Sequence, residues 1–108
     1  MIDSGWKTLT DTVKYRAIGN IGYVSKNDSP LLVSGNYGVI GTLPVGFRPF
    51  GADINVAATA YDNTNNSWAS GCSIQIQTGG QIVFWANPEG HSFRQIRFSA
   101  SFPTRNGV

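Results

Sequence analysis

Hydrophobic and polar residues alternate over short stretches of this chain, and glycine, asparagine and proline separate the stretches. Residues 13–18 and 21–25 form one such pair around Gly19-Asn20, a dipeptide that supports the tight turn of a β-hairpin. No window combines apolar residues at the helical spacing with a capping residue and suitable propensity. The pattern therefore predicts strands and turns with almost no helix.

Applied to the whole chain, the same criteria give roughly eight short strands with turn signals every few residues. The expected strands cover residues 6–10, 13–18, 21–25, 54–61, 68–77, 82–86 and 93–102, and residues 31–34 and 37–43 form a further pair or one broken strand. Turns at 27–30 and 87–90 are among those that separate them. We expect an all-β fold, a small antiparallel β-barrel or sandwich with Greek-key-like connections. At 108 residues the chain has the length of one domain, so we expect residues 1–108 to fold as a unit.

Residues 41–49 contain the densest turn signal in the chain, with two prolines and two glycines around Phe47 and Arg48. Each proline fixes its own φ and pushes the residue before it toward extended geometry, so neither a helix nor a central strand fits. We expect a corner between two sheet regions. Arg48 is expected to bind backbone carbonyl groups within this corner rather than a ligand.

Alternation divides the last three strands into a core face and an outer face. The core face receives Ile74, Ile76, Ile82, Phe84, Ile96, Phe98, Ala100 and Phe102. The outer face receives Ser73, Gln75, Gln77, Gln95, Arg97, Ser99 and Ser101. A three-residue loop would set Ile76 opposite Phe84 and Gln75 opposite Trp85, whereas a two-residue loop would mix the faces, so we predict the former register.

Trp85 then lies on the outer face beside Gln75, flanked by Ser73 and Gln77 and joined by Arg97 from the last strand. An indole face packs against sugar C–H groups, and amide and guanidinium groups bond ring hydroxyls or phosphate. We predict a saccharide-binding surface formed by Trp85, Arg97, Gln75, Ser73 and Gln77. The alternative is that Trp85 covers a subunit interface or the end of the core.

The titratable residues give little support for a catalytic function. Of the six carboxylates, Asp53 and Asp62 lie at opposite ends of one expected strand, about 30 Å apart, whereas a glycosidase pair needs roughly 5–10 Å. His91 is expected to be a plain turn residue. The single Cys72 excludes an internal disulfide and a cysteine zinc site, and we expect it to be a small buried residue. We therefore expect no enzyme, no metal and no cofactor.

Trp6 and Trp68 are weaker candidates for ligand binding than Trp85. We expect Trp6 to cap the core or a subunit contact, and Trp68 to lie in the core or at its rim.

Charged residues make up only 13% of the chain, and Asn, Ser, Thr and Gln supply the polar surface, a composition typical of a robust extracellular β protein. The net charge of +2 comes without a basic run, which argues against nucleic acid binding. The apolar runs are too short for a membrane span, and residues 1–5 lack the apolar region of a secretory signal. A protein released by lysis as part of a particle would satisfy these observations.

Three stretches together resemble the C-terminal head domain of phage receptor-binding proteins, with greatest similarity to the lactococcal siphophage baseplate family. They are Tyr15-Arg16-Ala17-Ile18-Gly19-Asn20-Ile21, Thr42-Leu43-Pro44-Val45-Gly46-Phe47-Arg48-Pro49 and Ile96-Arg97-Phe98-Ser99-Ala100-Ser101-Phe102, with the glycine-turn hairpin before the last. The resemblance implies a small antiparallel β-barrel that forms a homotrimer at the tail tip of the virion. It also implies reversible, non-catalytic binding to a host cell-wall polysaccharide, through a saccharide or a glycerol-phosphate-like group. Residues 1–108 would then be the head of a longer phage protein whose N-terminal part contacts other baseplate proteins.

In that family the site lies on the barrel near subunit contacts and uses a Trp, an Arg and polar strand residues. The resemblance places these on Trp85, Arg97, Ser73 and Gln75, the surface that alternation also selects. Family members often carry a His and an acid where this chain has Ser73 and Gln75, so a different saccharide is expected. Two other functions stay open: a purely structural baseplate or tail domain, and an enzyme acting on wall polymer or a carbohydrate-binding module attached to one.

Overall fold

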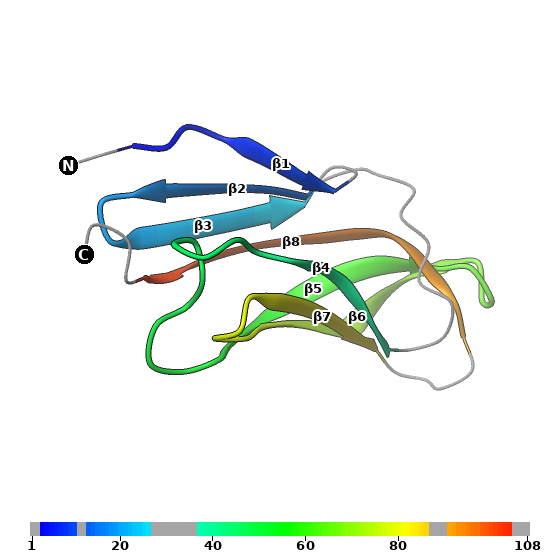
Figure 1. Cartoon of the computed structure of the whole chain (residues 1–108). Helices are drawn as coiled ribbons and strands as arrows, with labels where there is room; N and C mark the ends of the chain where they lie inside the picture. Colours follow the sequence, from blue (N-terminus) through cyan, green and yellow to red (C-terminus); the bar gives the residue numbers. More distant parts are fainter. Residues whose placement is uncertain (1–2, 11–12, 27–36, 87–90, 105–108) are drawn as a thin grey trace.

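The computed structural model describes residues 3–10, 13–26, 37–86 and 91–104. Eight strands run through these residues and no helix is found among them (Figure 1). The strands are β1 (Lys7–Thr10), β2 (Val13–Ile18), β3 (Ile21–Lys26), β4 (Tyr37–Thr42), β5 (Ile54–Asp62), β6 (Ser67–Ile76), β7 (Gln81–Ala86) and β8 (Phe93–Pro103). The all-β expectation is confirmed, while the strand expected at 31–34 and the turns expected at 27–30 and 87–90 lie outside the described residues.

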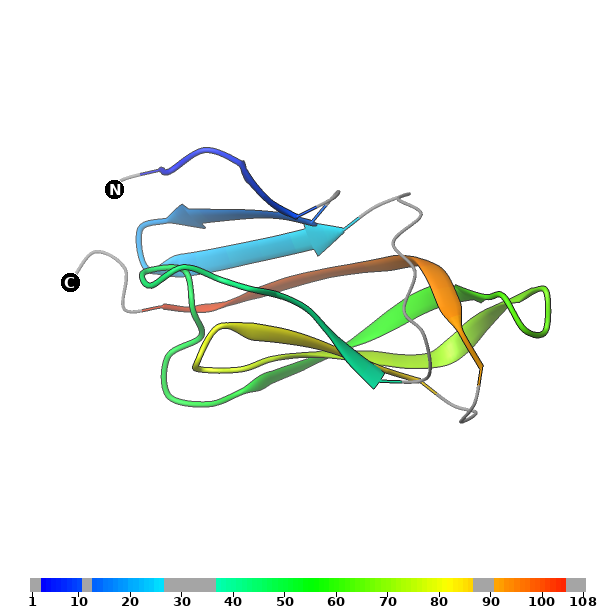
Figure 2. The same ribbon diagram turned by 45° about the vertical axis from the view of Figure 1, so that its right-hand side comes forward.

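The strands form one antiparallel sheet in the order β1-β2-β3-β8-β5-β6-β7-β4. Strands β5, β6 and β7 follow one another as a meander, and β8 returns to lie beside β5, which is the arrangement of a Greek key. The edge strands β1 and β4 lie in contact without pairing in the described part of the chain, so the sheet is nearly closed into a barrel. The β5–β6 turn lies at one end of this barrel and the proline-rich corner near the other (Figure 2).

The interior is filled by apolar positions that alternation assigns to the core face, together with Phe93, which strict alternation would place on the outer face. Phe84, Phe93, Ile74, Ile76, Ile82 and Ile96 are fully buried, and Phe84 and Phe93 pack with ring centroids 5.6 Å apart. Cys72 is also buried, as expected, and this burial raises the pKa of its thiol. The outer face of the sheet is consequently left with the polar and aromatic side chains of the alternate positions.

The proline-rich corner joins β4 to β5 across the end of the barrel, as predicted. Leu43 is buried, and Phe47 packs edge-on against Tyr15 of β2 with ring centroids 4.8 Å apart. Arg48 Nε donates to the carbonyl oxygen of Leu43 at 2.8 Å, which confirms the expectation that this side chain binds the backbone of the corner. The corner thus closes the core instead of presenting a cation to a ligand.

The register predicted between β6 and β7 is wrong by two residues. Ile76 pairs with Ile82, Ile74 with Phe84 and Ser73 with Trp85. The loop does have three residues, but it is closed by the N–H of Gln77 donating to the carbonyl of Gln81 at 2.9 Å, with Gly80 at a φ of 94°. Because a shift of two residues preserves the alternation, the core and outer faces are nevertheless those predicted.

Candidate functional site

Four of the five predicted site residues lie together on the outer face of β6 and β7. Trp85 is 43% exposed and lies directly opposite Ser73, with Gln75 one diagonal step away. Gln77 Nε2 donates to Gln75 Oε1 at 3.0 Å, so the two amides are held side by side. On its other side Trp85 pairs with Tyr37 of the edge strand β4, an exposed aromatic residue that alternation did not single out. We call Trp85, Ser73, Gln75, Gln77 and Tyr37 the Trp85 surface.

Arg97, the fifth predicted residue, is not beside Trp85. It belongs to β8, and the two strands β5 and β6 separate it from β7. Three strand spacings of ~4.8 Å put the two backbones ~14 Å apart. The guanidinium carbon of Arg97 instead lies 4.6 Å from the ring centroid of Trp68. The prediction that Arg97 joins Trp85 in one contact surface is therefore wrong for a single chain.

Arg97 and Trp68 belong to a larger cluster of stacked cations and aromatic rings on the outer face. Tyr61 and Trp68 pack edge to face with centroids 5.5 Å apart, and the guanidinium carbon of Arg94 lies 4.9 Å from the Tyr61 centroid. Trp68, which we expected in the core or at its rim, is 49% exposed here. We call Arg94, Tyr61, Trp68 and Arg97 the arginine–aromatic array. Its two guanidinium groups are held on ring faces, where cation–π attraction orients them.

Two β-bulges create this array, and they explain why strict alternation missed it. Arg94 and Arg97 pair with Tyr61 and Thr59, so β8 has one residue more than β5 between the two pairs. The bulge is accommodated at Gln95, whose backbone has a φ of 53°. A second shift in β6, where Cys72 and Ala69 pair with Ala58 and Ala60, turns Trp68 outward. Bulges commonly re-aim side chains in this way, and nothing in the alternation of the sequence marks these two.

A floor of small residues connects the array to the Trp85 surface. Thr59 pairs with Arg97, Ala57 pairs with Ser73, and both β5 residues are exposed. Gly71 is exposed as well, and a Cβ built there would meet no other atom within 4 Å. The outer face therefore carries a shallow path between a pair of arginines and an exposed indole.

The start of β8, just before Arg94, is fixed by His91. His91 Nδ1 lies 2.7 Å from Asp62 Oδ2, and Asp62 Oδ1 accepts the backbone N–H groups of Thr64 and Asn65 at 2.9 and 3.0 Å. The expectation that His91 is a plain turn residue is therefore wrong. Burial alone would raise the pKa of Asp62, but the hydrogen bonds from His91, Asn65 and Thr64 outweigh it and lower that pKa. Asp62 is thus an anchoring carboxylate, with its oxygens already engaged.

Neither a metal-binding cluster nor a membrane-spanning helix is found in the part of the chain that the structure describes. Among the described residues, no group of three or more His, Cys, Asp or Glu side chains could hold a metal ion. No helix long and apolar enough to cross a membrane occurs in the same residues. The side chains of the outer face offer aromatic stacking, hydrogen bonding and cationic contacts.

Comparison with known proteins gives a structural relative. No protein-family model matches the chain, and no curated protein sequence matches it. Among solved structures, the chain is similar to the head domain of phage bIL170, which is described among the receptor-binding domains of lactococcal phages. The TM-score is 0.66 at 26% identity, over 92% of this chain and 96% of that one. The fold is therefore that of a phage head domain, and the resemblance inferred from the sequence is confirmed.

Proposed function

We propose that this chain is the receptor-binding head of a phage adhesion protein and that it binds a cell-wall saccharide of the bacterial host. The observation that carries the proposal is the similarity to a phage receptor-binding head over almost the entire chain. The outer face supports it, because it presents Trp85 and the arginine–aromatic array on either side of an open floor of small residues. Residues 1–108 would be the head of a longer protein at the virion tail, whose other part contacts the baseplate.

The chemistry of the outer face favours a polysaccharide that carries phosphate or another anionic group. Trp85 offers an indole face for sugar C–H groups, while Ser73, Gln75 and Gln77 offer hydroxyl and amide groups to ring hydroxyls. Arg94 and Arg97 present fork-shaped donors suited to phosphate oxygens. A glycerol-phosphate-like group at the array and a sugar ring at Trp85 would use both ends of the path. Binding without hydrolysis is part of this proposal; Asp62, which borders the array, already has its oxygens engaged by His91 and two backbone N–H groups.

A homotrimer would give such a shallow site its strength. Single open sites bind weakly, and several heads on one particle raise the effective concentration at a surface. The edge strand β4 carries Tyr37 and Val39, which are 60% and 53% exposed and are available for a subunit contact. The same observation favours the second candidate function, a structural tail domain whose exposed aromatics serve assembly alone.

The test is binding of purified host-wall polysaccharide to wild type, Trp85→Ala and Val45→Ala, with molar mass measured by light scattering. Val45 is an exposed apolar residue of the corner, so its variant controls for loss of surface hydrophobicity. We expect Trp85→Ala to weaken binding about tenfold or more with unchanged mass, since tenfold corresponds to only 1.4 kcal/mol. Loss of the oligomer in Trp85→Ala with equal binding per chain would support the structural role instead. Release of sugar from the polysaccharide by wild type would contradict the non-catalytic part of the proposal.

A further inference from the structure

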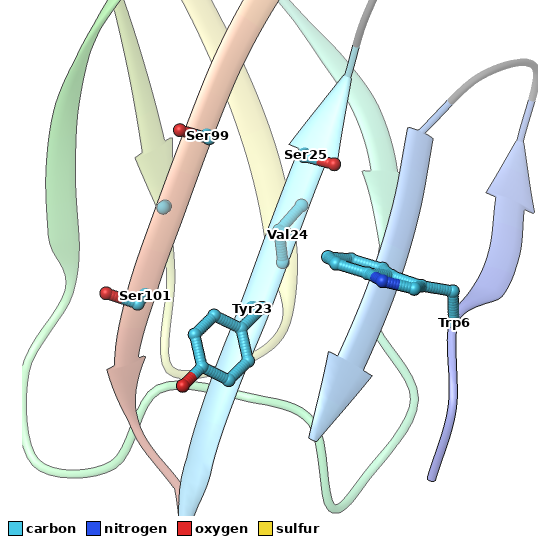
Figure 3. Close-up of a pocket in the computed structure, with 7 residues that line it drawn as sticks. Trp6, Tyr23, Val24, Ser25, Ser99 and Ser101 are labelled. Carbon is cyan, nitrogen blue, oxygen red and sulfur yellow. The ribbon is translucent and has the colours of Figure 1, made fainter. Parts of the chain in front are cut away.

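A separate groove lies on the outer face over β3 and β8, beyond Arg97 along β8. It has a volume of about 240 Å³ and is lined by Trp6, Tyr23, Ser25, Ser99 and Ser101, with Val24 and Ala100 beneath (Figure 3). Val24 is buried and Ala100 is half-buried against the core, so the polar and aromatic contacts of the groove come from the other five residues. We call the first five residues the serine groove. None of them belongs to the Trp85 surface or to the arginine–aromatic array.

The floor of the serine groove is a regular array of hydroxyl groups. Ser25 pairs with Ser99 and Tyr23 with Ser101 in an unbroken β3–β8 ladder, so all four side chains project from the same face. None of the four hydroxyls makes a hydrogen bond to any residue that the structure describes. Four hydroxyl groups, each able to donate and to accept, are thus open to a ligand.

The side wall is the indole of Trp6, which the chain holds above β2. Gly5 takes a φ of 70°, and its N–H donates to Asp3 Oδ1 at 2.8 Å. Asp3 also forms a two-point ion pair with Arg16 of β2, whose guanidinium carbon lies 5.7 Å from the Trp6 ring centroid. The backbone N–H of Ser4 donates to the carbonyl of Ala17 at 2.9 Å, and Ser4 Oγ accepts the N–H of Ala17 at 3.0 Å. These contacts fix the approach to Trp6, although its side chain is 50% exposed.

The side chains that line the serine groove differ in charge from those of the arginine–aromatic array, although cations border the groove. Lys14 and Arg16 of β2 pair with Ser25 and Tyr23, Arg97 lies two residues from Ser99 on β8, and the carboxylate of Asp3 offsets the charge of Arg16. The five lining side chains themselves carry no charge. An exposed aromatic face beside neutral hydroxyls suits a ligand with one C–H face and a rim of hydroxyl groups, which is the chemistry of a pyranose ring.

We propose that the serine groove binds a pyranose ring of a neutral saccharide, as a second contact point beside the main receptor site. The ring stacks on Trp6 and exchanges hydrogen bonds with the hydroxyls of Tyr23, Ser25, Ser99 and Ser101. The inference extends the proposed function, because a second subsite for an uncharged unit would let one head engage two parts of a wall polymer. It predicts weak binding that depends on Trp6 and the four hydroxyls and needs no charged group on the sugar.

The three tryptophans allow a direct test, since one lies on each surface: Trp6 in the serine groove, Trp68 in the array and Trp85 on its own surface. In NMR spectra of the ¹⁵N-labelled chain, the indole N–H signals are followed during titration with methyl glycosides of glucose, galactose, rhamnose and N-acetylglucosamine. We expect at least one glycoside to move the Trp6 signal and the amide signals of residues 23–25 and 99–101 saturably in the millimolar range. Trp6→Ala and Ser99→Ala/Ser101→Ala should each weaken this response about tenfold or more.

Trp68→Ala is the matched control, because Trp68 is as exposed as Trp6 and should leave the response unchanged. No response of the groove to any of the four glycosides would overturn the inference, as would shifts confined to Trp85 or Trp68. A change of molar mass in Trp6→Ala would overturn it as well, by assigning the groove to a subunit contact. Binding of wall polysaccharide to wild type is measured in parallel, so that failure of the groove can be told apart from failure of the proposed function.

Discussion

The serine groove and the arginine–aromatic array occupy the same sheet and the same outer face, but they are built differently. The groove lies on a β3–β8 ladder that runs from Ile21–Pro103 to Lys26–Phe98 without a shift. The array lies where both the β5–β8 and the β5–β6 ladders shift register. A regular ladder places like residues in rows and yields a uniform floor of hydroxyls. Two bulges bring together side chains that alternation would have put on opposite faces.

The two regions also differ in how they are anchored. The groove depends on the exposed pair of Asp3 and Arg16, whereas the array borders the buried carboxylate of Asp62 with His91 and two backbone N–H groups. Exposed ion pairs contribute little to stability, while hydrogen bonds to a buried carboxylate contribute more. The comparison therefore predicts that the array region is the more sensitive to substitution and to acid.

The largest effect is expected at Gly80, in the loop that sets Trp85 opposite Ser73. A Cβ there would approach the carbonyl oxygen of Leu43 to 2.7 Å, and the φ of 94° disfavours any other residue. Gly80→Ala should lower the free energy of unfolding by about 1–3 kcal/mol, measured by urea denaturation. Gly79→Ala is the control, since a Cβ at Gly79 meets nothing within 4 Å. Equal loss in both variants would contradict the account of this loop.

The second prediction compares the anchors at Asp62 and Asp3. Asp62→Asn should lower Tm by several degrees at pH 7, and Asp3→Asn should change it little, because only Asp62 is buried. The pKa of Asp62 is lowered in the folded chain, so its contribution is present above the ordinary pKa of 3.8 and is lost as the pH falls through the lowered value.

Calorimetry between pH 7 and pH 2 tests both anchors. The difference between wild type and Asp62→Asn should narrow below about pH 4. Hydrogen bonding to Arg16 lowers the pKa of Asp3 to about 2, so the Asp3–Arg16 pair should persist nearly to the acid limit. A constant Tm difference between wild type and Asp62→Asn over the whole pH range would show that the charge of the Asp62 carboxylate does not contribute to stability.

The smallest effect is expected at Gln95, whose bulge brings Arg94 onto the outer face. Glycine adopts a φ of 53° without a Cβ clash, so Gln95→Gly should leave stability unchanged or raise it by up to about 1 kcal/mol. Asn55→Gly, at an exposed position of regular strand β5, should cost about 0.5–1 kcal/mol. If Gln95→Gly costs as much as Asn55→Gly in urea denaturation, the bulge carries no backbone strain.

Sequence patterns were sufficient for the strands that the structure describes, for the faces of their regular stretches and for the corner, because these depend on alternation and on the fixed φ of proline. The exposed face of Trp85 and the buried face of Phe84 followed from alternation even though the register was off by two residues. It was harder to predict which residues of different strands lie next to one another. The sequence prediction placed Arg97 beside Trp85, because alternation does not show that β5 and β6 lie between them. Strand order depends on long-range pairing.

Three further features left no signal in the alternation. The outward turn of Trp68 and Arg94 depends on bulges whose extra residues look like ordinary strand residues. The pairing of His91 with Asp62 joins positions 29 residues apart. The serine groove requires β8 to lie beside β3, a neighbour relation that only the folded sheet provides.

The most direct test of the central claim is titration of the ¹⁵N-labelled chain with purified fragments of host-wall polysaccharide, following the three indole N–H signals. The account predicts saturable shifts of Trp85, accompanied by Trp68 when the fragments carry phosphate, and loss of the Trp85-centred response in Gln75→Ala/Ser73→Ala. If the fragments bind and the signals of Trp85 and Trp68 stay in place, the outer face between them is not the receptor site.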